Sequence, residues 1–237
     1  MRPILPAMSA ILTEPVYDTL LQILQQRYSC RAYQPEPVPR QLIEQILAAA
    51  QRTASSCNTQ PWHVHIVSGA ARDALSDRLY HEASERPPTE GDYDNPVRFV
   101  DHYRDRRFVC GMQLYDSVSI ERQDKAGRGR QMLENYRFFG APHVALIFNE
   151  GDLGTYGVLD CGAYATNFMN AATALGLGCV PQAAIAYYPD VVREFLGVPE
   201  SQRLVCAISF GYPDHDHPIN GFRTERASIA DVAVWHD

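Results

Sequence analysis

The chain has 237 residues, of which 46% are hydrophobic and 21% charged, and these values are ordinary for a globular protein. Its formal net charge of −7 at pH 7 argues against a general attraction to nucleic acid or to anionic membranes. No apolar run approaches the roughly 20 residues of a membrane-spanning helix, and the N-terminus lacks the pattern of a secretory signal. We therefore expect one cytoplasmic domain over residues 1–237, in which residues 1–15 form a loosely ordered arm.

The six cysteines are scattered along the chain, and none forms a Cys-x-x-Cys pair. A disulfide framework or a zinc site would show tighter spacing. Several cysteines lie in apolar runs, such as Val205-Cys206-Ala207. This pattern favours buried, reduced thiols, as in a protein of the cytoplasm.

The first part of the chain alternates helical and extended patterns. Val16, Leu20, Ile23 and Leu24 form one apolar stripe, which predicts a helix over residues 16–26. The other elements expected before residue 96 are an extended segment at 27–33, a helix from Pro39 to Ala50, a polar loop at 54–61, a strand at 62–67, a helix at 70–82 and a surface loop at 85–95.

The second part begins with a segment rich in aromatic and charged residues, 97–139, in which we expect two or three helices. A long helix at 159–175 carries many glycines and alanines, which would let a twin helix of a second copy, or an internal helix, approach closely. The other expected elements are strands at 143–148 and 204–210, an extended segment at 179–186 and a short helix at 189–196. This alternation favours an α/β or α+β fold.

Several common motifs are absent. The chain has no Gly-x-Gly-x-x-Gly fingerprint, no P-loop and no Gly-x-Ser-x-Gly elbow. Asp214-His215-Asp216-His217 offers metal-binding side chains, but it lies among glycine and proline residues, so a solvated loop is the better interpretation.

Two arginines flank a serine at regular spacing near the N-terminus. Arg27, Ser29 and Arg31 point to one side if the segment is extended, and Arg27 and Arg31 then lie about 13 Å apart. Such a pair suits a ligand that carries phosphate at one end and a ring that becomes anionic at the other. Two arginines that only solvate a loop would explain this pattern alone equally well.

Further polar residues could complete such a site. The Asn58 amide offers both a donor and an acceptor, although asparagine in a loop is usually a turn residue. The tail supplies two more cations, Arg223 and Arg226. It ends in the apolar residues Val232, Val234 and Trp235, so we expect the tail to pack against another surface.

Taken together, these motifs resemble the FMN-dependent nitroreductase family. Their order and spacing match over residues 16–235, and the segment 111–142 is similar to the branch that acts on nitrobenzoates and other nitroaromatics. The motifs that carry the resemblance are Arg27-x-Ser29-x-Arg31 with the Pro-Val-Pro helix after it, Asn58-x-Gln60-Pro61-Trp62, Gly178-x-x-Pro181-Gln182 and Phe222-Arg223-Thr224-Glu225-Arg226.

The resemblance implies an α+β fold with a mixed, mainly antiparallel sheet flanked by helices, in an intertwined homodimer with two FMN sites at the interface. Arg27 and Ser29 would hold the phosphate and ribityl groups, and Arg31 would face N1 and O2 of the flavin. Asn58 would meet the pyrimidine edge, and Arg226 with Arg223 would cross the interface to a phosphate. The remaining expected cofactor residues are Tyr28, Gln60, Pro181, Gln182, Ala183 and Ala184.

Two details of the implied site depart from the motifs or extend them. Many relatives carry glutamate where this chain has Ala183. Alanine keeps the backbone N–H as a donor for flavin N5, but it removes any role of a carboxylate at this position. Relatives use the insertion that corresponds to residues 97–139 to cover the flavin. Within it and at its end, Tyr115, Phe138 and Phe139 are the expected substrate contacts, because aromatic side chains stack on planar substrates.

The implied activity is reduction of small nitroaromatic or quinone-like oxidants, with NAD(P)H as electron donor and FMN as carrier. Two alternatives remain open at the level of sequence. One is another FMN reaction on the same fold, such as reductive dehalogenation or oxidation of a product. The other is a flavin-binding protein without turnover. We expect no metal site and no binding to nucleic acid or membranes.

Overall fold

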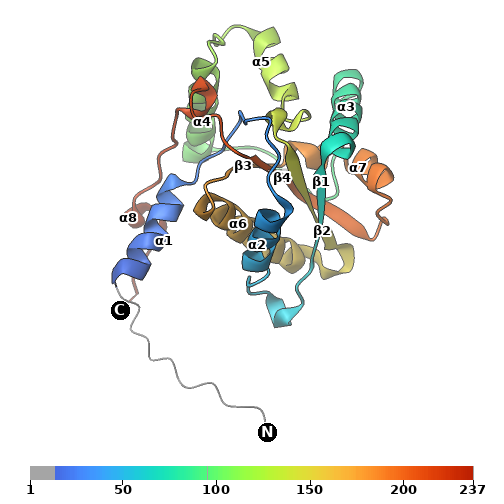
Figure 1. Ribbon diagram of the computed structural model, residues 1–237. Helices are drawn as coiled ribbons and strands as arrows, with labels where there is room; N and C mark the ends of the chain where they lie inside the picture. The colour runs from blue at the N-terminus through green and yellow to red at the C-terminus, as the bar shows by residue number, and fades with distance from the viewer. Residues whose placement is uncertain (1–13, 95, 237) are drawn as a thin grey trace.

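The computed structural model describes residues 14–94 and 96–236 (Figure 1). Its longer helices are α1 (Glu14–Gln26), α2 (Arg40–Ala50), α3 (Gly69–Glu85), α4 (Asp101–Ser117), α5 (Lys125–Leu133), α6 (Gly154–Ala174) and α7 (Pro189–Leu196). A short helix, α8 (Ile229–Val232), follows in the tail. The strands are β1 (Trp62–Ser68), β2 (His143–Glu150), β3 (Gly178–Gln182) and β4 (Gln202–Gly211).

The four strands form one sheet in the order β1-β2-β4-β3, and every neighbouring pair is antiparallel. The parallel component of the expected mixed sheet is a single bridge between Ser29 and Cys179. The central strand β2 is buried along almost its whole length, because helices cover both faces of the sheet. The expected α+β architecture is confirmed.

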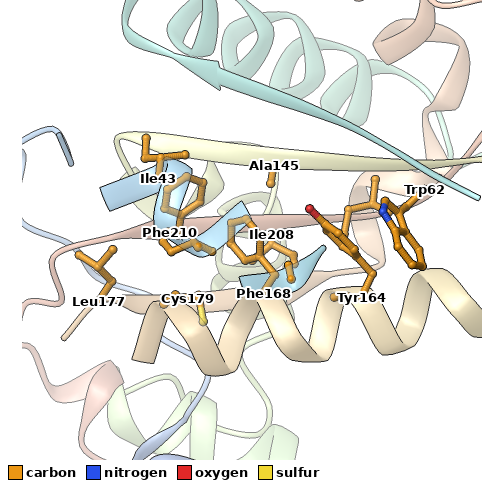
Figure 2. Packing of buried hydrophobic residues seen from close by; sticks show 14 of the residues in the cluster. Ile43, Trp62, Ala145, Tyr164, Phe168, Leu177, Cys179, Ile208 and Phe210 are labelled. Carbon is orange, nitrogen blue, oxygen red and sulfur yellow. The ribbon is translucent and has the colours of Figure 1, made fainter. Parts of the chain in front are cut away.

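Each face of the sheet carries its own hydrophobic core. On one face, α2 and α6 pack against the strands, and Figure 2 shows Tyr164 and Phe168 of α6 pointing toward Ala145, Ile208 and Phe210. The opposite core contains apolar residues of α3 and α7. Side chains of β2 alternate between the two cores, as the period of a strand requires.

Two predicted boundaries were wrong. The long helix begins at Gly154, five residues before the expected start. Gly157 in its first turn packs against the Asn149 side chain with no room for a Cβ atom. Glycine at this position therefore serves close packing and does not mark a loop. The segment after β3 is not extended to residue 186, because a 3-10 helix over Ala184–Tyr187 turns the fully buried Ile185 into the core.

Other expectations were met in part. Most of the expected arm at residues 1–15 lies outside the described residues, and its last two residues form the start of α1. All six cysteines are free, but only Cys30, Cys161 and Cys179 are buried, and Cys57 is exposed. No described helix is both long and apolar enough to cross a membrane.

The face of α6 that points away from the sheet is exposed and rich in small residues. Gly162, Ala163 and Thr166 lie on it, and Leu159 beside them is 65% exposed. Ala172, by contrast, is fully buried in the core, so it is no candidate for a contact with a second copy.

Replacing Phe168 with alanine should lower the free energy of unfolding by about 3–5 kcal/mol, because the ring is fully buried between α6 and the sheet. Chemical denaturation followed by circular dichroism measures this change. Val97→Ala is the matched control, since that side chain is fully exposed and its loss should change stability by less than about 0.5 kcal/mol. A loss below about 1 kcal/mol for Phe168→Ala would contradict the packing described here.

Candidate functional site: an arginine-lined cavity

The extended segment after α1 is fixed to the edge of the sheet. The Cys30 N–H donates to the carbonyl of Cys179 on β3 at 3.1 Å, and the Gln34 N–H donates to the carbonyl of Tyr212 at 2.8 Å. Gly178 permits this approach, since a Cβ atom there would lie 2.6 Å from the Cys30 sulfur. The segment is therefore extended from Ser29 to Tyr33 and runs beside β3. Arg27 lies at the end of α1, because its N–H still donates to the Ile23 carbonyl, so the expected extended segment begins later than predicted.

Asn220 fastens the same segment to the C-terminal tail. Its Oδ1 accepts from the Arg31 N–H at 2.8 Å, and its Nδ2 donates to the carbonyls of Ala32 and Asp214 at 2.9 and 2.8 Å. The side chain is 4% exposed. Asn220 thus sets the position of Arg31, and sequence reasoning missed it because a lone asparagine after a proline looks like a turn residue.

A cavity of about 570 Å³ opens between α1, α4 and the tail. This volume lies within the range of ordinary small-molecule sites. Its walls bring together six of the predicted site residues from opposite ends of the chain, and they add Cys110 and Phe222, which were not among the expected cofactor or substrate contacts. The predicted residues in the wall are Arg27, Tyr28, Ser29, Arg31, Arg223 and Arg226.

The four arginines of this cavity have no acidic partner. None of them forms a salt bridge with a residue in the described part of the chain. Arg223 and Arg226 donate only to backbone carbonyls and to the Thr224 hydroxyl. In a chain with a net charge of −7, such a group of unpaired cations forms a local site for an anion.

Aromatic rings hold two of these guanidinium groups. The Arg223 guanidinium carbon lies 3.8 Å from the centroid of the Tyr28 ring. Arg31 stands between Phe139 and Phe222, with its guanidinium carbon 5.9 and 5.8 Å from the two ring centroids. Burial lowers the pKa of Arg31 from its usual value, because desolvation penalises the charged form. An anionic ligand would stabilise that charge.

A smaller cavity of about 170 Å³ adjoins at Arg31. Tyr115, Phe139 and Pro181, all predicted site residues, line it together with Gln131 and Met132 of α5. Arg31 faces both cavities, so one ligand could extend from the arginine cluster to this aromatic surface. The smaller cavity alone lies below the usual size of a ligand site.

Two predicted contact residues have other positions. Phe138 is fully buried in the core that contains α3 and α7, so it does not reach a ligand in this structure. Phe138 and Phe139 both have φ near +50°, and this turn sends one ring into the core and the other toward Arg31. Gln182 is 2% exposed, and its side chain donates to the Asn135 carbonyl and accepts from the Ser209 hydroxyl.

Asn58 and Gln60 lie apart from the arginine cluster. Their loop approaches α6 at Asp160, whose carboxylate accepts from the Ser56 N–H, whereas Arg27 shares a cavity with Thr173 at the other end of that helix. Thirteen residues of helix correspond to about 20 Å. The cavities that contain Arg27 are lined by neither Asn58 nor Gln60. Ala183 and Ala184, after β3, lie at the surface or partly exposed.

The acidic and histidine residues of 214–217 form a turn. Asp214 Oδ1 accepts from the Asp216 N–H, and His217 Nδ1 accepts from the Ile219 N–H. In residues 14–94 and 96–236, no group of three such side chains could hold a metal ion.

The ionisation of Tyr28 should make stability fall at high pH. Burial raises its pKa from 10.0 to about 12, although Arg223 beside it has the opposite effect. The folded protein therefore binds this proton more tightly than the unfolded chain, so the contribution to stability is complete below about pH 10 and is lost between about pH 10 and 12. Denaturation curves across this range should show a smaller loss for Tyr28→Phe than for the unchanged protein. If the free energy of unfolding falls equally in the two proteins, Tyr28 is not a group whose raised pKa stabilises the fold.

Comparison with known proteins is consistent with this geometry. The Nitroreductase family profile matches residues 24–212. The chain is 37% identical to nitroreductase NfnB of Mycolicibacterium smegmatis, over 89% of this chain and 90% of that one. It is 35% identical to a 4-nitrobenzoate reductase of Pseudomonas putida, over 88% and 92% of the two chains. The crystal structure of the FMN-dependent nitroreductase NfnB from Mycobacterium smegmatis, in complex with NADPH, superposes with a TM-score of 0.88 at 34% identity, over 93% of this chain and 100% of that one. The chain belongs to the nitroreductase family.

Proposed function

We propose that the protein is an FMN-dependent oxidoreductase that uses NAD(P)H to reduce nitroaromatic compounds. The observation that carries this proposal is the cavity with four arginines that lack acidic partners. The names of the relatives, which include a nitroreductase and a 4-nitrobenzoate reductase, support nitro reduction over dehalogenation or a sensor role.

The residues of the larger cavity fit the phosphate end of FMN. Arginine binds phosphate through two parallel charge-assisted hydrogen bonds, and a phosphate dianion would neutralise cations that are unpaired in this structure. Arg27, Arg223 and Arg226 of the same chain would hold the phosphate, with Ser29 and Tyr28 beside them, so Arg223 and Arg226 would act within their own chain and not across an interface as expected. When bound, FMN accepts hydride from the nicotinamide and passes electrons to the oxidant.

Arg31 and the smaller cavity would serve the flavin ring and the substrate. The permanent charge of Arg31 stabilises negative charge at the ring, and Asn220 and the two flanking aromatic rings hold it in place. Pro181, Ala183 and Ala184 would lie along the ring, where the backbone N–H groups of the two alanines can donate to it. Tyr115 and Phe139 offer aromatic faces on which a planar substrate stacks.

We further propose that the site is completed in a homodimer. The exposed small-residue face of α6 suits close packing against a second copy, and α1 and the tail expose apolar side chains, including Tyr17 at 59% and Trp235 at 81%. A second copy would also explain why the loop with Asn58 and Gln60 lies at one end of α6 while Arg27 lies at the other end. In the dimer, that loop would contact the FMN bound by the partner subunit.

The remaining expectations stay proposals. Residues 97–139, which contain α4 and α5, would cover the flavin as part of a single domain. The six free cysteines support a reducing compartment such as the cytoplasm.

Arg27→Ala should weaken FMN binding at least about tenfold, since a charge-assisted hydrogen bond contributes roughly 1.5–3 kcal/mol. Quenching of flavin fluorescence on titration of the apoprotein measures the dissociation constant. Arg40→Ala is the matched control, because Arg40 is exposed and pairs with Glu44 away from the cavity. Equal FMN affinity in Arg27→Ala and the unchanged protein would contradict the proposal that Arg27 binds the phosphate of FMN.

Ala163→Arg should convert the dimer to monomers, because a long cation on the small-residue face of α6 blocks helix contact. Light scattering after size exclusion gives the mass. Ala74→Arg, an exposed position on α3 at the opposite face of the sheet, should stay dimeric. If Ala163→Arg keeps the dimer mass and full FMN content, α6 is not at the interface.

A further inference from the structure

Arg128 is a cation without an acidic partner beside the smaller cavity. Its guanidinium carbon lies 5.9 Å from the centroid of the Tyr115 ring. No residue within the described ranges forms a salt bridge with it, and its buried Nε has no hydrogen-bond acceptor. A buried, unsatisfied donor on a charged group disfavours folding. An anionic ligand would supply the missing acceptor.

Helical spacing places Arg128 on the side of α5 that faces this cavity. Gln131 and Met132 line the cavity, and they follow Arg128 by three and four residues, which is the spacing of neighbours on one helix face. Tyr115, the ring that Arg128 contacts, lines the same cavity from α4. Arg128 therefore stands one helical turn from the lining residues and next to one of the aromatic walls.

The cations of the site are thus divided between two places. Arg31 lines both cavities, whereas Arg128 lines neither and lies one helical turn before Gln131 and Met132, next to the Tyr115 ring. A planar ring that stacks on Tyr115 would place a substituent next to Arg128. Carboxylate suits this position best, since the guanidinium fork matches its two oxygens.

We propose that Arg128 binds an anionic substituent of the substrate, so that the enzyme prefers nitroarenes that carry a carboxylate over neutral nitroarenes of the same size. This inference rests on the proposed function, because it assigns the substrate class of the same site. Arg128 acts here on substrate choice and leaves the electron transfer itself to the cofactor.

The test compares benzoate with benzamide, which have nearly the same shape but differ in charge and are not reduced. Calorimetric titration of the FMN-loaded protein should show benzoate binding at least about tenfold more tightly than benzamide. Arg128→Met should abolish this difference and leave benzamide binding and FMN content unchanged. Arg130→Met is the matched control, because Arg130 is exposed on the same helix and lies two residues away, where side chains do not share a face.

Steady-state kinetics give a second measurement. The ratio of kcat/KM for 4-nitrobenzoate to that for 4-nitrobenzamide should fall about tenfold or more in Arg128→Met and stay unchanged in Arg130→Met. Arg128→Lys, which keeps the charge but loses the planar fork, should give an intermediate ratio. If Arg128→Met does not fold, Arg128→Lys provides the test. An Arg128→Lys ratio of kcat/KM values equal to that of the unchanged protein would then overturn the proposal.

Equal binding of benzoate and benzamide by the unchanged protein would overturn the proposal, and so would unchanged benzoate affinity in Arg128→Met. Its failure is distinguishable from failure of the proposed function. A protein that binds no FMN defeats the proposed function. An FMN-loaded protein that reduces 4-nitrobenzamide but shows no preference for benzoate defeats only the role of Arg128.

Discussion

The hydrogen bond from the Cys30 N–H to the Cys179 carbonyl joins the segment after α1 to the edge of the sheet. Because the chain leaves α1 after Arg27 and is extended from Ser29, Arg27 and Arg31 are separated along the cavity and do not crowd one another. The contact requires glycine at 178, since any side chain would collide with Cys30. Asn220 then fastens the tail to the same segment through hydrogen bonds. These bonds bring Arg223 and Arg226 close to Arg27 and Arg31, which precede them by nearly 200 positions.

This arrangement concentrates positive charge in a protein that is acidic as a whole. Each unpaired arginine repels its neighbours, and the partial burial of Arg31 adds a desolvation cost. A phosphate group removes the repulsion at one end of the cavity, and negative charge on a reduced ring would do so at the other. The same reasoning extends to Arg128, which contacts the Tyr115 ring and forms no salt bridge with a residue in the described part of the chain. The acidic balance of the remaining surface would discourage binding of large polyanions.

Sequence patterns predicted most of the framework, because amphipathic stripes report directly which face of a helix or strand is buried. Spacing placed Arg27 and Arg31 on one side of their segment, but only the family resemblance assigned these arginines to a cofactor site. The positions of Phe138 and Asn220 depend on features that no local pattern reveals. Two consecutive left-handed residues turn Phe138 into the core, and Asn220 gains its role only from contacts with residues 31 and 32. Likewise, a motif cannot show that Asn58 lies far from the arginines of its own chain.

The central claim is that the arginine cluster binds the phosphate of FMN, and the most direct measurement compares FMN with riboflavin, which lacks that phosphate. If at least two charge-assisted hydrogen bonds hold the phosphate, the apoprotein should bind FMN about 100-fold or more tightly than riboflavin. The difference should shrink as ionic strength rises, because salt screens the exposed arginines. Equal dissociation constants for the two flavins, independent of salt, would contradict the account.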